Sequence, residues 1–425
     1  MNNIETEIIK IQTDKEIFKR GEFENIVLKY KDNIENLQQW ELYWLGRSYY
    51  KLEKYKECIK VYKLYLEKCK DKDILKNFAL WAYYKTLDFY IEKNDKNKIL
   101  NIGLFIIKNN NKENALLNNL TCNKMIKYIS NEKVNVDIYS LYHWNNRLNI
   151  NELKTEPNVI TLDGKIRTLP SEIERYYSTK SKCELKLNFN EHCIATCDEA
   201  LNSSCFENFV YREWFYFRKA KSLKALEKFD EAIEVLKPIL IKNTNSYFKL
   251  LLGDIFILKG EKEKGLFYYC DGLYRKEPLD KKVRIIEAVG DLLLEKDPKI
   301  AKEHYILTKN LREKNSWSIS DDLDKKINHI EILINENEVE KNCKEQWRKI
   351  YTNNLEKATG KIARLINPRA GIIKMENGEI YFEKSDLINY NECKIGVNVS
   401  FNIIESYDKK KNRLSNKAIN IKIIK

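Results

Sequence analysis

A single recurring pattern constrains the fold of this chain more than any other feature. Two amphipathic helical stretches follow each other across a short turn, and each carries a small residue near its middle. In "LYWLGRSYYKLEKYKECIKVYKLYL" the small residues are Gly46 and Cys58, and in "YFRKAKSLKALEKFDEAIEVLKPIL" they are Ala220 and Ala232. Because small side chains let two helices approach closely, the pattern predicts antiparallel pairs of packed helices.

The pattern returns at intervals of about 33 residues, the length of one helix pair. The third copy, "YFKLLLGDIFILKGEKEKGLFYYCDGLYRKEP", has Gly253 and Gly265 at the small positions. The fourth, "IIEAVGDLLLEKDPKIAKEHYILTKNL", has Gly290 and Ala301. Such a pair buries its apolar face only against its neighbours, so several copies predict a stacked array. Weaker copies lie at residues 18–30, around Trp81 and Ala82, and at residues 191–202.

The composition supports a mainly helical fold. The 425 residues include only 13 Gly and 6 Pro, whereas compact α/β enzymes need many glycines in their loops. The abundance of Lys, Asn and Ile is a compositional bias, as in AT-rich bacterial coding. A chain of this length can hold two or three structural units.

Two changes of pattern divide the chain. Residues 149–170, "NINELKTEPNVITLDGKIRTLP", have two prolines, an Asp-Gly pair and no helical period, which predicts an ordered connector or a short hairpin. Ser320 is the expected N-cap of a later helical segment. The predicted segments are a helical block at 1–148, the connector at 149–170, a second helical block at 171–316, a helical stalk at 317–357 and a β-barrel at 358–425.

The last part of the chain changes to a period of two. Short β-branched runs alternate with turns there, including an Asn-Gly pair at Asn377 that is typical of a tight hairpin. Five short strands in so few residues predict a closed five-stranded barrel of the OB type. The predicted strands lie at 360–366, 370–375, 378–383, 396–404 and 416–424.

The helix pairs resemble the tetratricopeptide repeat, a unit of two helices and about 34 residues. The resemblance implies an α-solenoid in which fixed positions of each first helix line a concave groove. Aromatic and cationic side chains at such positions suit an acidic peptide, a carboxylate terminus or a nucleic-acid strand. Carried onto this chain, the positions are Tyr43, Arg47, Tyr50 and Lys51 in the first block and Trp214, Phe217, Lys221 and Lys224 in the second.

The order of the C-terminal strands resembles the cold-shock domain, from "TGKIARLINPRAGII" through "EIYFEKSDL" and "IGVNVSFNI" to "NKAINIKII". That family stacks bases of a single strand on aromatic side chains of its second and third strands. Here those positions fall on Ala370 and Ile372, and on Tyr381 and Glu383, so that Tyr381 alone keeps a ring. The alternation predicts that Phe382 points into the barrel core.

The charge of the barrel region points to a polyanion as partner. The whole chain has a formal charge of +13, and residues 357–425 contain 14 Lys and Arg against 7 Asp and Glu. Cationic side chains can neutralise phosphates, which favours RNA or single-stranded DNA. Two alternatives are a Lys-rich surface that serves solubility and a barrel that docks onto a protein. The predicted contact residues are Arg364, Arg369, Lys374, Tyr381, Lys384, Lys409, Lys410, Lys411, Arg413 and Lys417.

No enzyme motif occurs in the sequence. There is no GxxxxGK, GxGxxG, GxSxG or HExxH. His192, Cys193, Cys197 and Cys205 raise the possibility of a zinc site, but Cys193 and Cys197 fall where the repeat needs small buried residues, so we expect core cysteines. We therefore expect no catalytic residues, no metal and no cofactor.

The ten cysteines are scattered without a CxxC, and neither an apolar signal segment nor an apolar run of membrane-spanning length is found. These features predict a cytoplasmic protein with free thiols. The predicted function is a non-enzymatic bacterial scaffold whose array binds a protein partner and whose barrel weakly binds RNA or single-stranded DNA. Two alternatives are a pure protein–protein adaptor with a docking barrel and a peptide-sensing regulator.

Overall fold

Helices account for most of the computed structural model, and a small closed β-barrel ends it, which confirms the predicted fold class. Side chains are described from Ile11 onward. The structure describes residues 3–69, 71, 73–110, 114–131, 136–241, 245–274, 277–388, 394–408, 411 and 413–424.

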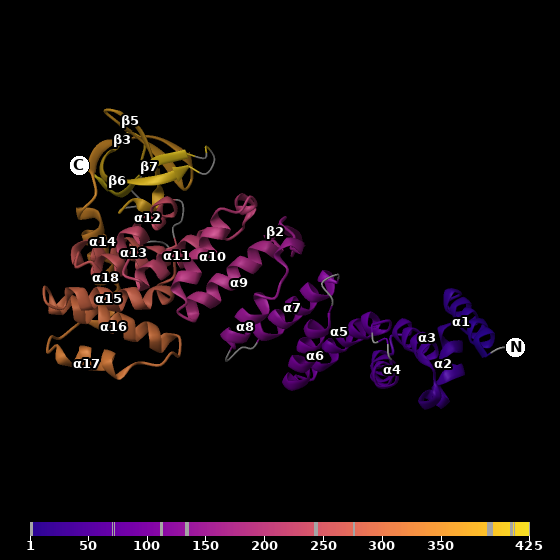
Figure 1. Ribbon diagram of the computed structural model, residues 1–425. Helices are drawn as coiled ribbons and strands as arrows, with labels where there is room; N and C mark the ends of the chain where they lie inside the picture. The colour runs from indigo at the N-terminus through magenta and orange to yellow at the C-terminus, as the bar shows by residue number, and fades with distance from the viewer. Residues whose placement is uncertain are drawn as a thin grey trace. The chain divides into compact units, whose positions relative to one another are not determined.

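The chain forms two compact units. The first comprises residues 1–189 and 202–210, and the second comprises residues 190–201 and 211–425 (Figure 1). Each unit is built mainly from consecutive helices that pack against their neighbours in sequence. Among the described residues, none of the helices has both the length and the apolar character that crossing a bilayer requires.

The first unit contains helices that pack as consecutive pairs, with α3 against α4 and α5 against α6. Gly46 of α3 lies so close to Leu75 that a Cβ atom there would approach that side chain to 2.9 Å. The helices are α1 (Asn3–Lys19), α2 (Phe23–Tyr30), α3 (Gln39–Lys51), α4 (Tyr55–Lys68), α5 (Lys76–Glu92), α6 (Lys96–Asn109), α7 (Ala115–Ser130), α8 (Ile138–Asn145) and α9 (Glu172–Lys186).

A two-stranded hairpin precedes α9. Strand β1 (Asn158–Leu162) pairs antiparallel with β2 (Lys165–Leu169) across the Asp163-Gly164 turn. Both turn residues have positive φ, 51° and 71°, which is the conformation of a tight hairpin whose twist matches its strands. The segment predicted as a connector or a short hairpin therefore contains a hairpin.

The second unit begins with α10, which packs against α11, and continues as helix pairs. The second unit also contains the 3₁₀ turns η4 (Leu279–Lys282), η5 (Glu336–Glu338) and η6 (Lys384–Asp386), and the first unit contains η3 (Phe206–Asn208). The helices are α10 (Asn190–Leu201), α11 (Glu213–Ala225), α12 (Phe229–Leu240), α13 (Ser246–Leu258), α14 (Lys262–Tyr274), α15 (Val283–Leu293), α16 (Pro298–Lys314), α17 (Asp321–His329) and α18 (Val339–Asn353).

Two glycines allow α13 and α14 to come into close contact. A Cβ atom at Gly253 would lie 2.4 Å from the ring of Tyr269, and one at Gly265 would lie 3.1 Å from the carbonyl oxygen of Gly253. The Tyr269 hydroxyl donates a hydrogen bond of 2.6 Å to Asp254, which holds the ring in place. The small positions of the repeat thus set the distance between the two helices.

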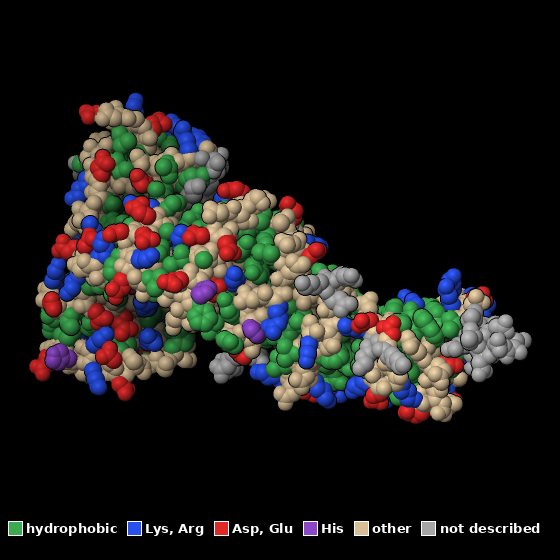
Figure 2. Space-filling model, viewed as in Figure 1, with side chains coloured by type: hydrophobic (Ala, Val, Ile, Leu, Met, Phe, Trp, Pro, Cys, Tyr) green, Lys and Arg blue, Asp and Glu red, His purple; other side chains and the backbone are tan. Residues whose placement is uncertain are grey.

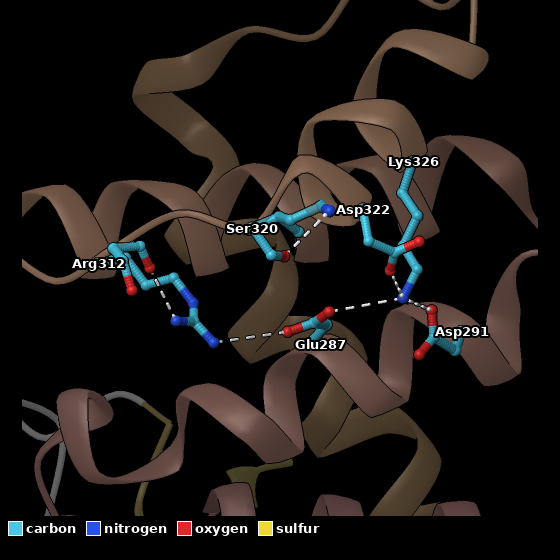
Figure 3. Close-up of polar contacts among 8 residues, drawn as sticks. Glu287, Asp291, Arg312, Ser320, Asp322 and Lys326 are labelled. Atoms are coloured by element: carbon cyan, nitrogen blue, oxygen red, sulfur yellow. Dashed lines mark hydrogen bonds and ion pairs between the residues drawn. The ribbon is translucent and has the colours of Figure 1, made fainter.

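Charged side chains link successive helix pairs. The carboxylate of Asp254 on α13 accepts from Lys224 on α11 and from Arg284 on α15, both at 3.1 Å. At the end of the array, Lys326 of α17 lies among three carboxylates (Figure 3). Its ammonium group is 3.4 Å from Glu287, 3.0 Å from Asp291 and 3.1 Å from Asp322.

The N-terminus of α17 is capped as predicted. The Ser320 hydroxyl accepts a hydrogen bond of 3.3 Å from the backbone N–H of Leu323. Three aspartates in the first turn stabilise the helix further, because their negative charges lie near the positive end of the helix dipole.

Helix α18 differs from the stalk that we predicted for residues 317–357. It packs against α14 and α16 and buries one side chain per turn, Val339, Cys343, Trp347 and Tyr351. Because these apolar residues follow one another at intervals of four, they form one continuous buried stripe along the helix. The segment is therefore part of the helical core of the second unit.

Trp347 makes a buried polar contact with α16. Its indole N–H donates to Nε2 of His304 at 2.7 Å, and Nδ1 of His304 lies 2.8 Å from the carbonyl oxygen of Ile300. Because that carbonyl can only accept, Nδ1 carries the proton and Nε2 is the acceptor, as in a neutral imidazole. Burial lowers the pKa of His304 to about 4.

The C-terminal barrel closes in the strand order β3-β4-β5-β7-β6, which is consistent with an OB-like domain (Figure 1). Neighbouring strands are antiparallel except β5 and β7, which run parallel. The second and third strands have the predicted bounds, whereas β6 and β7 extend to the hairpin tip because they pair as far as Asp408 and Arg413. The strands are β3 (Lys357–Asn367), β4 (Ala370–Met375), β5 (Gly378–Glu383), β6 (Asn398–Asp408) and β7 (Arg413–Ile423).

We predict that Gly253→Ala destabilises the protein, although alanine normally stabilises a helix interior relative to glycine. The new methyl group would overlap the Tyr269 ring, and overpacking of this kind costs about 1–3 kcal/mol of unfolding free energy. Thermal unfolding of the purified variant measures the change. A melting temperature equal to or above that of the wild type would contradict the close packing.

We also predict that His304 makes the protein sensitive to acid. Its pKa is about 4 in the folded protein, against 6.5 for an ordinary histidine, so the unfolded chain binds the proton more readily. The free energy of unfolding is therefore unaffected by His304 above about pH 6.5. It decreases as the pH falls toward 4, by on the order of 3 kcal/mol at most.

Melting temperatures between pH 7 and pH 4 measure this effect. His304→Gln cannot take up the proton, so its melting temperature should fall less over this range than that of the wild type. His329→Gln is the matched control, because His329 is exposed on α17. If His304→Gln kept the acid profile of the wild type, His304 would not be the group responsible.

Candidate functional site

The outer face of β4 and β5 carries the predicted aromatic position. Tyr381 is 37% exposed, whereas Phe382 is fully buried in the barrel core, as the alternation predicted. Ile372 lies opposite Tyr381 in the antiparallel register, and Ala370 lies opposite Glu383. One exposed ring therefore stands beside the half-buried side chain of Ile372.

A concavity of about 530 Å³ surrounds this ring at the end of β5. Its wall comes from the turn between β3 and β4, from the outer face of β5 and from η6. We call it the Tyr381 pocket, and it is lined by Asn367, Pro368, Arg369, Ala370, Tyr381, Glu383, Lys384 and Ser385.

Backbone hydrogen bonds hold the two cationic residues of the pocket next to each other. The side-chain oxygen of Asn367 accepts from the backbone N–H of Arg369 at 2.8 Å, which shapes the turn after β3. The backbone N–H of Lys384 donates to the carbonyl oxygen of Arg369 at 2.9 Å. This bond joins the β3–β4 turn to η6, and Tyr381 of β5 lines the same pocket.

Several cationic side chains of the barrel form ion pairs with nearby carboxylates. Arg364 of β3 makes two parallel hydrogen bonds with the carboxylate of Glu379, at 3.0 and 2.8 Å. Lys417 of β7 lies 3.2 Å from Glu383 and 2.8 Å from Asp386. These carboxylates offset part of the positive charge that the sequence suggested for the barrel surface.

The remaining predicted contact residues are spread over the barrel. Lys374 of β4 lies opposite Glu379 in the strand register. Arg413 of β7 lies opposite Asp408 of β6 in the register at the β6–β7 tip. The backbone N–H of Lys411 donates to Asp408 at 3.2 Å. None of Lys374, Lys411 and Arg413 lines the Tyr381 pocket. Lys409 and Lys410 lie outside the described residues.

Sequence reasoning missed the polar part of the pocket. Asn367, Pro368 and Ser385 line it, and Glu383 had been considered only as a lost aromatic position. The Asn-Pro-Arg sequence at the β3–β4 turn was an available signal, because asparagine and proline both favour tight turns. The pairing of Glu383 with Lys417 had no local signal, since the two residues lie 34 positions apart.

The predicted groove residues of the first unit are largely engaged inside that unit. The guanidinium of Arg47 lies over the rings of Phe18 and Phe78, at 4.4 and 4.6 Å from the ring centres. It also donates to the Tyr43 hydroxyl at 2.8 Å. Tyr50 packs against Phe78 as well, with ring centres 6.0 Å apart. Lys51, by contrast, is exposed.

The predicted groove residues of the second unit form an aromatic cluster on α11 and α13. Trp214 packs edge-on against Phe217, with ring centres 5.3 Å apart, and lies 5.7 Å from Phe248. Lys221, one helical turn after Phe217 on α11, is exposed. Lys224 is the second cationic position, and its ammonium group pairs with Asp254.

Surface charges on the second unit are of both signs. Figure 2 shows Lys and Arg interspersed with Asp and Glu over its helices. A second concavity of about 560 Å³ lies between α14, α18 and η6, where Lys341, Lys344 and Arg348 stand among four carboxylates. This mixture of signs makes the second concavity a poorer match for a polyanion than the Tyr381 pocket.

Two of the cysteines considered for zinc, Cys193 and Cys197, lie on α10, and the third, Cys205, lies directly before η3; all three are buried. Cys193 and Cys197 are completely buried, as expected for small positions of a helix pair. In the part of the chain that the structure describes, no three His, Cys, Asp or Glu side chains are placed to hold a metal ion. Burial also raises the pKa of the Cys58 and Cys122 thiols to about 12, which makes them poor nucleophiles.

Comparison with known families identifies one matching region. A family model described as "Domain of unknown function (DUF7017)" matches residues 213–354, which is about a third of the chain. The match begins at the first residue of α11 and ends directly after α18. It therefore covers the helices from α11 to α18 and stops before the barrel. No curated protein matches the chain.

Proposed function

We propose that this protein is a non-enzymatic scaffold whose barrel binds RNA or single-stranded DNA and whose helical units bind a protein partner. The observation that carries the nucleic-acid part is the Tyr381 pocket, whose lining combines one exposed aromatic ring with the cationic residues Arg369 and Lys384. Barrels of the OB type bind oligonucleotides on the face of their second and third strands. That face corresponds here to β4 and β5, where the pocket lies.

The chemistry of the pocket suits one nucleotide of a single strand. The Tyr381 ring offers a stacking surface for a base, and stacking on an aromatic residue contributes about 1–3 kcal/mol of binding free energy. Arg369 and Lys384 offer cations for the adjoining phosphates. Because neighbouring charges are paired with carboxylates, we infer weak binding, and the phosphate contacts of Arg369 and Lys384 make that binding decrease with salt.

The helical units support the scaffold part of the proposal. We infer that the helix pairs are tetratricopeptide-like repeats, because the small positions Gly253, Gly265, Ala220 and Ala232 are buried at the helix contacts. Repeats of this kind typically hold an extended partner on the face of their first helices. The exposed Lys221 beside the aromatic cluster of α11 and α13 favours an acidic peptide segment there. We further propose that the protein acts in a bacterial cytoplasm.

A protein-docking barrel is the second candidate. The pairing of Arg364 with Glu379 and of Lys417 with Glu383 favours it, because these ion pairs reduce the charge available to a polyanion. The two candidates differ in one measurable property, the affinity of the barrel for single strands at low salt.

The test is fluorescence anisotropy of a labelled 12-nucleotide single strand at two salt concentrations. We expect binding near 50 mM salt that weakens about sevenfold at 200 mM, because two phosphate contacts on a single strand give a slope of about −1.4 in log affinity against log salt. Arg369→Glu with Lys384→Glu should abolish most of it, and Tyr381→Ala should weaken it about fivefold or more. Lys422→Glu is the matched control, because Lys422 is an exposed cation of the same barrel outside the pocket.

Melting temperatures of the variants establish that each one is folded. Absence of binding by the folded wild type at low salt would contradict the nucleic-acid proposal and leave the docking barrel. Equal losses for Lys422→Glu and for the pocket variants would indicate diffuse attraction rather than a site.

A further inference from the structure

The Tyr381 pocket contains a carboxylate whose position is fixed by its neighbours. Glu383 lies two residues after Tyr381 on the same face of β5 and lines the same pocket. Its carboxylate is 3.2 Å from the ammonium group of Lys417 and accepts a bond of 3.4 Å from the Ser385 hydroxyl. A buried partner, Asp386, binds Lys417 from the other side at 2.8 Å.

A carboxylate in a site for a polyanion requires an explanation. It repels phosphates, and its replacement by a neutral residue would improve purely electrostatic binding. Lys417 offsets this charge but is itself shared with Asp386. The ion pair with Lys417 links β5 to β7, and the place of Glu383 in the pocket lining also allows its oxygens to accept hydrogen bonds from a bound ligand.

We propose that Glu383 selects guanine as the base that stacks on Tyr381. This inference rests on the proposed nucleic-acid function and assigns the base that the same pocket prefers. Guanine presents two adjacent donors on its pairing edge, the ring N1–H and the exocyclic amino group. A carboxylate presents two acceptor oxygens side by side, so the two groups can form a pair of parallel hydrogen bonds.

The other bases match this acceptor pair less well. Uracil has one N–H between two carbonyl oxygens, which the carboxylate repels. Adenine and cytosine each offer one amino group beside a ring nitrogen that is itself an acceptor. Only guanine can therefore satisfy both oxygens of Glu383 without an opposing lone pair.

The spacing along β5 fits this arrangement. Residues two apart on one face of a strand are about 7 Å apart. The edge of a purine stacked on the Tyr381 ring can therefore come within hydrogen-bond reach of the Glu383 carboxylate. A carboxylate has about four acceptor positions, so contacts with Lys417 and Ser385 are compatible with further hydrogen bonds from a base.

The test compares nine-nucleotide uridine strands that differ only in the central base: uracil, adenine, cytosine, guanine or hypoxanthine. We expect the guanine strand to bind at least about fivefold more tightly than the uracil strand. Hypoxanthine keeps N1–H but lacks the amino group, so its strand should bind with intermediate affinity. The readout is anisotropy at low salt.

Two variants separate recognition from general charge. Glu383→Gln should reduce the guanine preference to below about twofold without weakening the uracil strand, because the amide replaces one acceptor with a donor. Glu379→Gln is the matched control and should keep the preference. Glu379 points outward from the same strand but lies outside the pocket and pairs with Arg364.

The outcomes distinguish this inference from the function on which it rests. Equal affinity of the wild type for all five strands would overturn the guanine assignment and leave the nucleic-acid proposal intact. A guanine preference that survives in folded Glu383→Gln would overturn it as well. If the wild type bound none of the strands at low salt, both proposals would fail together.

Discussion

The buried side chain of Trp347 joins three parts of the second unit. It lies on α18, donates to His304 of α16 and belongs to one apolar cluster that also contains Leu273 of α14 and Ile419 of β7. Since α18 leads directly into β3, this packing fixes the start of the barrel against the helices. The close helix contacts at Gly253 and Gly265 shape the helical surface on which α18 lies.

The side of the barrel that meets the helices determines which side is left open. Asn402 of β6 donates to the carbonyl oxygens of Thr352 and Leu355 at the end of α18, at 3.0 and 3.3 Å. Ile404 of β6 and Ile419 of β7 pack against the same helical core. Because β6 and β7 make these contacts, the outer face of β4 and β5 stays accessible, and Tyr381 can remain partly exposed without loss of core packing.

Local periodicity made much of this fold predictable. The helix pairs, the β1–β2 turn, the bounds of β4 and β5 and the inward position of Phe382 all follow from residues close together in the sequence. The packing of α18 did not follow, because an apolar stripe such as Val339 to Tyr351 predicts a buried face but not the element that covers it.

The chemistry of the candidate site was less predictable, because it depends on contacts between residues far apart in the sequence. Tyr381 and its nearby cations could be identified from strand alternation, yet their ion pairs depend on barrel closure. Lys417 meets Glu383 only because β5 and β7 run parallel, and Arg47 is covered by Phe18 and Phe78 from two other helices. Charge counted along a sequence therefore overestimates the charge that a surface offers to a partner.

Photocrosslinking tests the central claim, that the β4–β5 face meets the nucleic acid, most directly. A single strand with 4-thiouridine beside a guanine would be irradiated with the intact protein at low salt, and the crosslinked tryptic peptide would be identified by mass spectrometry. The account predicts crosslinks in residues 375–384, the peptide that contains Tyr381 and Glu383. Crosslinks confined to the helices between residues 213 and 354 would contradict it.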